Sequence, residues 1–339
     1  MGRGAAVLGN FSFPIDAVYL WVDGADPEWL AKKNKVIHSV KGTGTQLQQD
    51  AHAKGRFADN GELKYSLRSL SLYAPWIRNV YIVTDNQCPA RINREYVTIV
   101  DHKEIFPEFA SLPCFSSRAI ELCVHRIGNL SEHFLLFNDD CFLGSMVFPN
   151  DFFLEKGDPV LWVVKKKKKY RPKLLADDYP QMSAYRGADV FSRRLILKRY
   201  NKYLPYRVRH YPKPMLRTAM EEIWNMFPQD VERTLAGHFR KTNDLLIATF
   251  FSYFMIATQR GRLRTINGLR AVTDFLGGRV RHITANVGGQ VFHKRMKQIK
   301  NQKPLTFCIN DAEYSSDRDR KTIPEFLSAY FADKCFYER

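Results

Sequence analysis

Short apolar runs that end in acidic residues are the feature that most constrains how this chain can fold. Four such runs, rich in β-branched and aromatic residues, are IDAVYLWV (15–22), NVYIVTD (79–85), YVTIVD (96–101) and FLLFN (134–138). The acids that follow or close three of them are Asp23, Asp85, Asp139 and Asp140. Runs of this length and composition predict buried β-strands.

Helical patterns separate the predicted strands. Asp26 followed by Pro27 is typical of a helix N-cap with proline at the first helical position. Asp59 and Glu62 have the spacing of a capping box, and three leucines at helical spacing follow them. SSRAIELCVHRI (116–127) also predicts a helix. The alternation predicts an α/β fold, with a mostly parallel Rossmann-like sheet and helices on both faces.

The excess of positive charge lies in the second half of the chain. Residues 1–150 carry 15 Lys+Arg and 16 Asp+Glu, a net of −1, whereas residues 151–339 carry 37 and 19, a net of +18; the two sum to the formal charge of +17. Such a surface attracts polyanions. Nucleic acid, a phosphorylated polymer and anionic lipid headgroups all remain open on charge alone.

The second half has a less regular pattern. VLWVV (160–164) predicts a further strand, and residues 190–300 read as mainly helical. The apolar stretch LLIATFFSYFMIAT (245–258) is too short to span a bilayer and predicts a buried core helix.

Cysteine usage and the N-terminus predict a soluble cytoplasmic protein. A chain of 339 residues can bury a large core without disulfide bonds, so we expect the cysteines to be reduced. The N-terminal residues lack the long apolar segment of a signal peptide. Contact with the inner face of the membrane is expected to be peripheral at most. The six cysteines form no CxxC motif and are Cys88, Cys114, Cys123, Cys141, Cys308 and Cys335.

The acids at the strand ends are candidate ligands for a divalent cation. Ligands of open α/β sheets bind beyond the carboxyl ends of the strands, so parallel neighbours would bring Asp23, Asp85, Asp139 and Asp140 together there. Oxygen ligands suit Mg²⁺ or Mn²⁺ carrying phosphate. For any single acid, capping of the next helix is the simpler interpretation. For Asp139 and Asp140 together, behind a wholly apolar strand, we favour metal binding.

Three basic residues are candidate partners of a phosphate group. Arg68 and Arg240 could each clamp phosphate oxygens, and His210 could accept a proton near neutral pH. The alternative for His210 is an ordinary loop histidine, and for Arg240 an ordinary surface charge.

The strings around these residues resemble the conserved blocks of the Stealth family of sugar-1-phosphate transferases. IDAVYLWVDGADP (15–27), DNGELKYSLRSLSLYAPWIRNVYIVTDNQCP (59–89) and LPCFSSRAIELCVHRIGNLSEHFLLFNDDCFLG (112–144) resemble the first two blocks. RHYPKPMLRTAMEEIW with HFRKTND (209–244) resembles the third block, and FCINDAEY (307–314) the fourth. The family includes bacterial capsule polymerases, and the compact chain favours that type.

The resemblance implies transfer of a hexose- or hexosamine-1-phosphate from a UDP-sugar to a saccharide hydroxyl, with release of UMP. It implies a GT-A-like core that binds the nucleotide sugar, a basic helical region that completes the active site, and a C-terminal segment that returns to the core. We expect these parts at residues 1–150, 151–300 and 301–339. A polyanionic saccharide acceptor, rather than nucleic acid, would be the partner of the basic half.

The resemblance also implies roles for individual residues. Asp139 and Asp140 would hold Mg²⁺ or Mn²⁺, with Asp140 counted among the catalytic groups. Arg240, with Arg68, would stabilise phosphoryl oxygens. His210 would be the general base, with Asp23 as the alternative. The further substrate-binding residues would be Trp21, Gly24, Asn60, Glu62, Asp85, Asp244, Asn310 and Asp311.

Two other functions remain open from the sequence. A GT-A-type glycosyltransferase would use the same acids but release UDP. A non-catalytic binder of nucleic acid or membrane would need the basic half and no acids at the strand ends.

Overall fold

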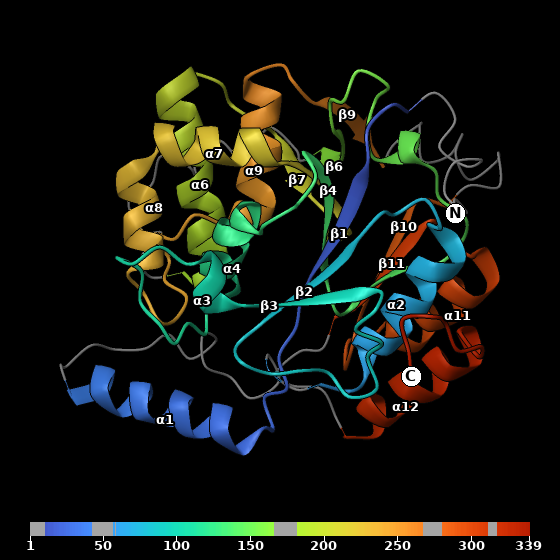
Figure 1. Ribbon diagram of the computed structural model, residues 1–339. Coiled ribbons are helices and arrows are strands. Elements are labelled where there is room, and N and C mark those ends of the chain that lie inside the picture. The colour runs from blue at the N-terminus through green and yellow to red at the C-terminus, as the bar shows by residue number, and fades with distance from the viewer. Residues whose placement is uncertain (1–10, 43–56, 58, 166–181, 267–279, 311–316) are drawn as a thin grey trace.

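The computed structural model describes residues 11–42, 57, 59–165, 182–266, 280–310 and 317–339 (Figure 1). A five-stranded sheet runs through its centre in the order β3-β2-β1-β4-β8. The first four of these strands are parallel, and β8 pairs antiparallel with β4 at the edge. The bounds are β1 Ile15–Leu20, β2 Val80–Thr84, β3 Val97–Asp101, β4 His133–Asn138 and β8 Lys213–Leu216. The predicted α/β fold with a mostly parallel sheet is confirmed.

Helices cover both sides of this sheet, as Figure 1 shows. On one side lie α4 (Ser117–Cys123), α6 (Ala184–Tyr200), α7 (Arg217–Met226), α8 (Pro228–Leu235) and α9 (Ile247–Ala257). On the other lie α2 (Glu62–Tyr73), α11 (Phe292–Gln302) and α12 (Asp317–Tyr330). The remaining α-helices are α1 (Pro27–Gly42) and α3 (His102–Ile105), and a 3₁₀ turn, η3 (Val124–Arg126), continues α4.

Two three-stranded sheets flank the central one. One has the order β10-β11-β5 and the other β7-β6-β9. Their strands are β5 (Cys141–Leu143), β6 (Val160–Lys165), β7 (Tyr206–Val208), β9 (Arg262–Thr265), β10 (His282–Asn286) and β11 (Thr306–Asn310). Helices predominate over strands among the described residues of 190–300, as expected, but β7, β8, β9 and β10 interrupt them. Strands of three to five residues are too short to give a period-two pattern that stands out from helical neighbours.

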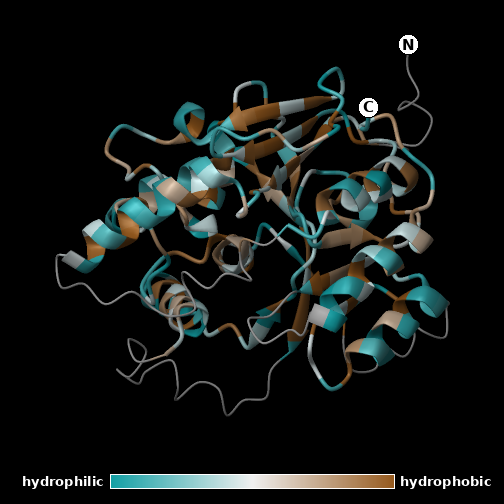
Figure 2. Ribbon diagram, turned by 90° about the horizontal axis from the view of Figure 1, so that it is seen from below, coloured by the Kyte–Doolittle hydropathy of each residue, from teal (hydrophilic) through white to brown (hydrophobic). Residues whose placement is uncertain are grey.

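The apolar stretch at 245–258 forms a core helix, as predicted. Phe250 and Phe254 of α9 are fully buried, and Phe251 is 1% exposed. Figure 2 shows hydrophobic residues concentrated in the central strands, with hydrophilic residues on the outer helices. Within the described ranges, none of the helices combines the length and apolar character needed to cross a membrane.

Helix α1 has the predicted side-chain N-cap, whereas α2 does not. Asp26 Oδ1 accepts a hydrogen bond from Trp29 N at 2.8 Å, and α1 begins at Pro27, as predicted. The capping box expected at the start of α2 does not form, because Gly61, with φ 79°, precedes the first helical residue, Glu62. The carboxyl group of Glu62 instead accepts from the backbone N of Asn60 at 2.7 Å. The acid therefore holds the loop before the helix.

Candidate active site

Asp139 and Asp140 form the turn at which the chain leaves the central sheet and enters the β10-β11-β5 sheet. The turn joins β4 to β5, and Asp139 Oδ1 accepts from Asp140 N at 3.1 Å. Ile309 N, on β11, donates to the backbone oxygen of Asp140 at 3.1 Å. Backbone pairing on both sides therefore fixes the two carboxylates at the carboxyl end of a central strand, where the sequence predicted them.

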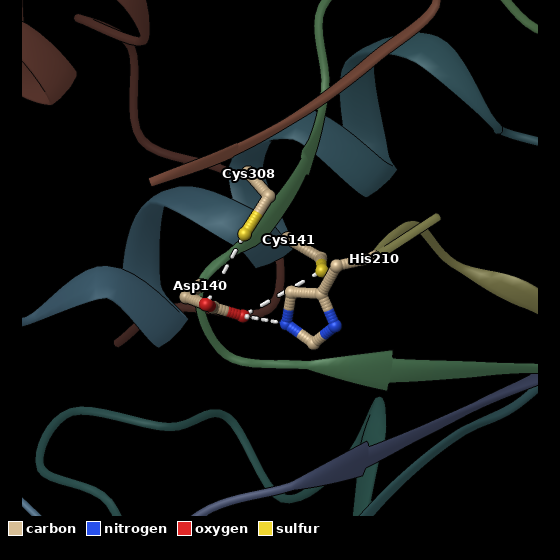
Figure 3. A group of neighbouring side chains, drawn as sticks. All are labelled: Asp140, Cys141, His210 and Cys308. Atoms are coloured by element: carbon tan, nitrogen blue, oxygen red, sulfur yellow. Dashed lines mark hydrogen bonds and ion pairs between the residues drawn. The ribbon is translucent and has the colours of Figure 1, made fainter. Parts of the chain in front are cut away.

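His210 faces this turn because β8 pairs antiparallel with β4. Leu136 of β4 is opposite Lys213 of β8, and extending this register by three residues brings residue 210 level with Asp139. The imidazole Nε2 lies 3.1 Å from Asp140 Oδ1 and 3.3 Å from Asn138 Nδ2. Figure 3 shows the ring pointing at the carboxylate. The structure thus brings together two of the predicted catalytic residues, which are 70 positions apart in sequence.

The contact between Asp140 and His210 shifts the pKa of both groups. Burial opposes the charged form of Asp140, but the charge and hydrogen bond of His210 outweigh it, so the pKa of the carboxyl group is lowered. Burial likewise opposes the His210 cation, but Cys141 and Asp140 raise the pKa of the imidazole well above its usual value. In this structure the pair therefore favours a carboxylate with an imidazolium.

Asp139 belongs to a group of acids that repel one another. Burial raises its pKa well above the usual value, and repulsion from Asp140, Glu62 and Asp59 raises it further. Burial also raises the pKa of Glu62 to about 7. Carboxyl groups that destabilise one another's charged form are stabilised by a hard divalent cation, so these oxygen atoms fit Mg²⁺ or Mn²⁺. Asp59 is a candidate that the sequence interpretation assigned to helix capping alone.

Trp21 positions Asp59 instead of offering an open stacking surface. Its indole Nε1 donates to Asp59 Oδ2 at 3.1 Å, and the residue is 8% exposed. Asn60 Nδ2 donates to Glu62 Oε1 at 2.7 Å. The predicted donor-binding residues Trp21, Asn60 and Glu62 therefore belong to the hydrogen-bonded segments around Asp59, which contribute to the acidic group.

The other predicted residues at the sheet edge have partners of their own. Asp23 Oδ1 accepts from Ala25 N at 2.9 Å, and Asp85 Oδ2 lies 3.2 Å from Lys32 Nζ. A Cβ atom on Gly24 would lie 2.1 Å from the backbone oxygen of Phe57. Gly24 is therefore required for a close approach between two loops. The described contacts of Asp23 and Asp85 tie them to local structure rather than to Asp139.

Arg68 is engaged elsewhere in the structure. Its Nε and Nη2 donate to the two carboxylate oxygens of Glu338 at 2.7 and 2.9 Å, and its Nη1 donates to the backbone oxygens of Phe331 and Ala332 at 2.7 and 3.1 Å. The expected contact with phosphate would have to compete with these four bonds. The geometry instead makes Arg68 the anchor of the C-terminal segment.

Arg240 and Asp244 lie in the loop between α8 and α9. Arg240 Nη2 donates to Ser117 Oγ at 2.6 Å, and its buried Nε has no partner among the described residues. Asp244 Oδ2 accepts from Lys241 N at 2.7 Å and lies 3.3 Å from Arg118 Nη1. Asp244 therefore shapes the loop that carries Arg240, whose guanidinium keeps a donor for an incoming anion.

Asn310 is exposed at the end of β11, where its Nδ2 donates to Asn286 Oδ1 at 3.2 Å. Asp311, predicted with it, lies outside the described residues.

Two cysteines that the sequence analysis did not assign to the site lie against Asp140. Cys308 Sγ is 3.2 Å from Asp140 Oδ2, and Cys141 Sγ is 3.6 Å from Asp140 Oδ1 (Figure 3). Burial opposes the Cys141 thiolate, but Cys308 and His210 stabilise it and lower the thiol pKa to about 7. Both cysteines stand next to predicted site residues in NDDC and FCIND, a signal that could have drawn attention to them.

Glu121 on α4 is a further residue that the sequence interpretation missed. Burial raises its pKa, and Lys213 and His210 partly offset that effect. Its Oε2 is buried and has no partner in the described part of the chain. Glu121 is therefore a buried titratable group close to His210 and Lys213.

Comparison with known proteins places these residues in a family. Models of three conserved regions of Stealth proteins match residues 13–41 (region 1), 56–161 (region 2) and 209–257 (region 3). The capsular polysaccharide phosphotransferase LcbA of Aeromonas hydrophila is 32% identical over 330 residues, covering 96% of this chain and 86% of LcbA. The chain belongs to the Stealth family. Asp139, Asp140 and Glu62 lie in the second matched region, and His210, Arg240 and Asp244 in the third.

Some relatives extend well beyond the matched region. Exopolysaccharide phosphotransferase SCO6023 of Streptomyces coelicolor is 36% identical over 340 residues, which cover 98% of this chain and 54% of the relative. The chain thus spans about half the length of that relative. Among solved structures, the galactosyltransferase LgtC covers 93% of the chain at 8% identity and a TM-score of 0.42, a similarity too low to support a functional argument.

Proposed function

We propose that this Stealth protein transfers a hexose- or hexosamine-1-phosphate from a UDP-sugar to a hydroxyl of a saccharide acceptor and releases UMP. The observation that supports this most is the contact between Asp140 and His210 beside an acidic group that favours a cation. A base, an acidic cation site and a cationic side chain, Arg240, are the parts that phosphoryl transfer needs.

The reaction assigns each bond change to a group. The acceptor hydroxyl oxygen attacks the phosphorus that carries the sugar, and the bond from that phosphorus to the bridging oxygen breaks. UMP leaves with the bridging oxygen, and a phosphodiester forms. His210 takes the hydroxyl proton at Nδ1, while its Nε2–H donates to Asp140, which orients the ring and stabilises the imidazolium, as a carboxylate does for histidine in other enzymes. Arg240 stabilises the phosphoryl oxygens.

Mg²⁺ or Mn²⁺ would be held by Asp139 and Asp140, with Glu62 and Asp59 adding negative charge around them. When bound, the ion would neutralise charge on the diphosphate and, by repulsion, favour the neutral imidazole that accepts a proton.

The acceptor is inferred from charge and from the relatives. The net charge of +18 in residues 151–339 favours a polyanionic chain, and the matched relatives are named capsular or exopolysaccharide phosphotransferases. We propose a phosphodiester-linked surface polysaccharide as acceptor, not nucleic acid, with the enzyme in the cytoplasm at the inner face of the membrane.

Nucleotide product analysis tests this proposal. The protein would be incubated with Mg²⁺ or Mn²⁺, a panel of UDP-sugars and an oligosaccharide acceptor, and UMP and UDP would be measured. We expect UMP that depends on acceptor and metal and that is lost in Asp139→Asn. The matched control is Asp333→Asn, because Asp333 is exposed near the C-terminus.

The alternatives give different products. UDP in place of UMP would indicate a glycosyltransferase and refute the proposed bond cleavage. Neither nucleotide, with polyanion binding unchanged in Asp139→Asn, would indicate a binding protein.

A further inference from the structure

Four side chains of different chemistry meet around Asp140. The donor atoms of Asp140, Cys141, His210 and Cys308 all lie within 4.8 Å of one another (Figure 3). Asp140 and Cys141 come from the turn into β5, His210 from the loop before β8, and Cys308 from β11. Residues from three separate parts of the chain therefore supply one carboxylate, one imidazole and two thiols.

The spacing of these donors suits a tetrahedral ion. Zinc bonds of about 2.0–2.3 Å place neighbouring ligand atoms roughly 3.3–3.8 Å apart in a tetrahedron. Asp140 Oδ1 lies 3.1 Å from His210 Nε2 and 3.6 Å from Cys141 Sγ, and Asp140 Oδ2 lies 3.2 Å from Cys308 Sγ. Small side-chain rotations would bring all four donors to coordination distance.

The β-ladder holds the two sulfur atoms in place. Cys308 and Cys141 are direct partners in the antiparallel pairing of β11 with β5. Ile309 N donates to Asp140 O at 3.1 Å beside them, and both cysteines are at most 1% exposed. The strand pairing therefore holds the two cysteines close together before an ion binds.

The donor set differs from the one that Mg²⁺ prefers. Thiolate sulfur and imidazole nitrogen select zinc and similar ions, whereas Mg²⁺ and Mn²⁺ prefer carboxylate oxygen and water. The two sides of the turn are therefore chemically distinct: Asp139 adjoins Asp59 and Glu62, and Asp140 adjoins nitrogen and sulfur.

We propose that Asp140, Cys141, His210 and Cys308 form a binding site for one Zn²⁺ ion. An ion on His210 Nε2 would replace the hydrogen bond to Asp140, and its positive charge would disfavour proton uptake at Nδ1, so the ion inhibits the transferase. This inhibitory consequence rests on the proposed function, whereas metal binding itself does not.

Cobalt titration of the reduced, metal-free protein tests the site without substrate. Co²⁺ replaces Zn²⁺ in tetrahedral sites and gives a sulfur-to-cobalt charge-transfer absorption when thiolates coordinate it. We expect saturation at one equivalent of Co²⁺, and loss of the absorption on addition of one equivalent of Zn²⁺. In Cys308→Ala, and separately in Cys141→Ala, we expect the absorption to fall by at least half and the affinity at least tenfold.

Cys88→Ala is the matched control, because Cys88 is exposed and remote in sequence from the four ligands. It should bind like the unaltered protein. Circular dichroism of each variant checks the fold, and His210→Gln gives a variant that tests the nitrogen ligand without altering a cysteine. An unchanged absorption in both cysteine variants, or its absence in the unaltered protein, overturns the site.

The two proposals fail separately. Stoichiometric Co²⁺ binding in the titration, with no UMP formed in the separate assay with Mg²⁺ or Mn²⁺, would refute the transferase and keep the metal site. UMP formation that is insensitive to equimolar Zn²⁺, with no cobalt absorption, would refute the metal site and keep the transferase.

Discussion

At the residue scale, the chemistry of His210 depends on the carboxylate it contacts. An isolated loop histidine would keep a pKa near its usual value, but Asp140 and Cys141 raise it although burial acts in the opposite direction. The same contact fixes which ring nitrogen faces the site. Asp140 is thus a positioning group for the base as well as a candidate metal ligand.

Replacement of His210 by glutamine should lower kcat, because glutamine keeps a polar side chain but cannot accept the hydroxyl proton. We expect a loss of roughly 100- to 10,000-fold, the usual contribution of a general base. The rate of UMP release at saturating donor measures kcat. The control is His38→Gln, at an exposed position of α1. A KM increase with unchanged kcat would contradict the role of base.

At the scale of elements, the site depends on loops that approach one another closely after β1. Gly24 N donates to Phe57 O at 2.8 Å, which brings the β1–α1 loop against the segment that leads to Asp59. Trp21 and Asp59 are then joined by their own hydrogen bond at 3.1 Å. The acidic group therefore depends on this backbone contact.

Substitution of Gly24 by alanine should destabilise the protein, because the added methyl carbon would lie 2.1 Å from Phe57 O. We expect the free energy of unfolding to fall by about 1–3 kcal/mol, as for other overpacked sites. Denaturant unfolding measures the change. Gly42→Ala, where a Cβ atom meets nothing within 4 Å, should leave stability within about 0.5 kcal/mol, and equal effects in the two variants would argue against the close approach.

At the scale of the whole molecule, the last residues of the chain are tied to the helix that leads from the acidic group. Arg68 of α2 bonds both carboxylate oxygens of Glu338 at 2.7 and 2.9 Å, and both side chains are 7% exposed. The β11–β5 pairing joins the C-terminal region to the same part of the fold. Residues near the two ends of the chain thus stabilise one site.

Loss of this ion pair should weaken the fold in a pH-dependent way. Burial acts against the Glu338 charge, but Arg68 outweighs it and lowers the carboxyl pKa below its usual 4.5. The stabilisation is therefore complete above the pKa of the unfolded chain and is lost as pH falls through the lower, folded pKa. Glu338→Gln should cost about 1–3 kcal/mol at pH 7 and progressively less below pH of about 4.5.

Urea unfolding at pH 7 and at acidic pH would measure this difference. Glu325→Gln, at an exposed position of α12, should show little effect at either pH. A loss in Glu338→Gln that is the same at both pH values would show that packing, not charge, stabilises the C-terminus.

The four parallel strands of the central sheet and the acids at its edge could be predicted from the sequence alone. Apolar runs bounded by polar residues specify buried strands locally, so β1, β2, β3 and β4 were predictable, and so was the acid pair behind β4. The third-region motif also identified His210. Strands and the residues that follow them are specified by neighbouring residues in the sequence, so they can be predicted from one sequence.

How those residues combine depends on long-range contacts in the folded chain. The strand β5 has three residues, and nothing in its sequence indicates that it leaves the central sheet and pairs with β11. That pairing places Cys308 against Asp140, and the β4–β8 register places His210 there. The fold also brings Arg68 into hydrogen-bonding contact with Glu338. Contacts between residues 70 to 270 positions apart arise from strand register and helix packing, so their donors converge only once the chain has folded.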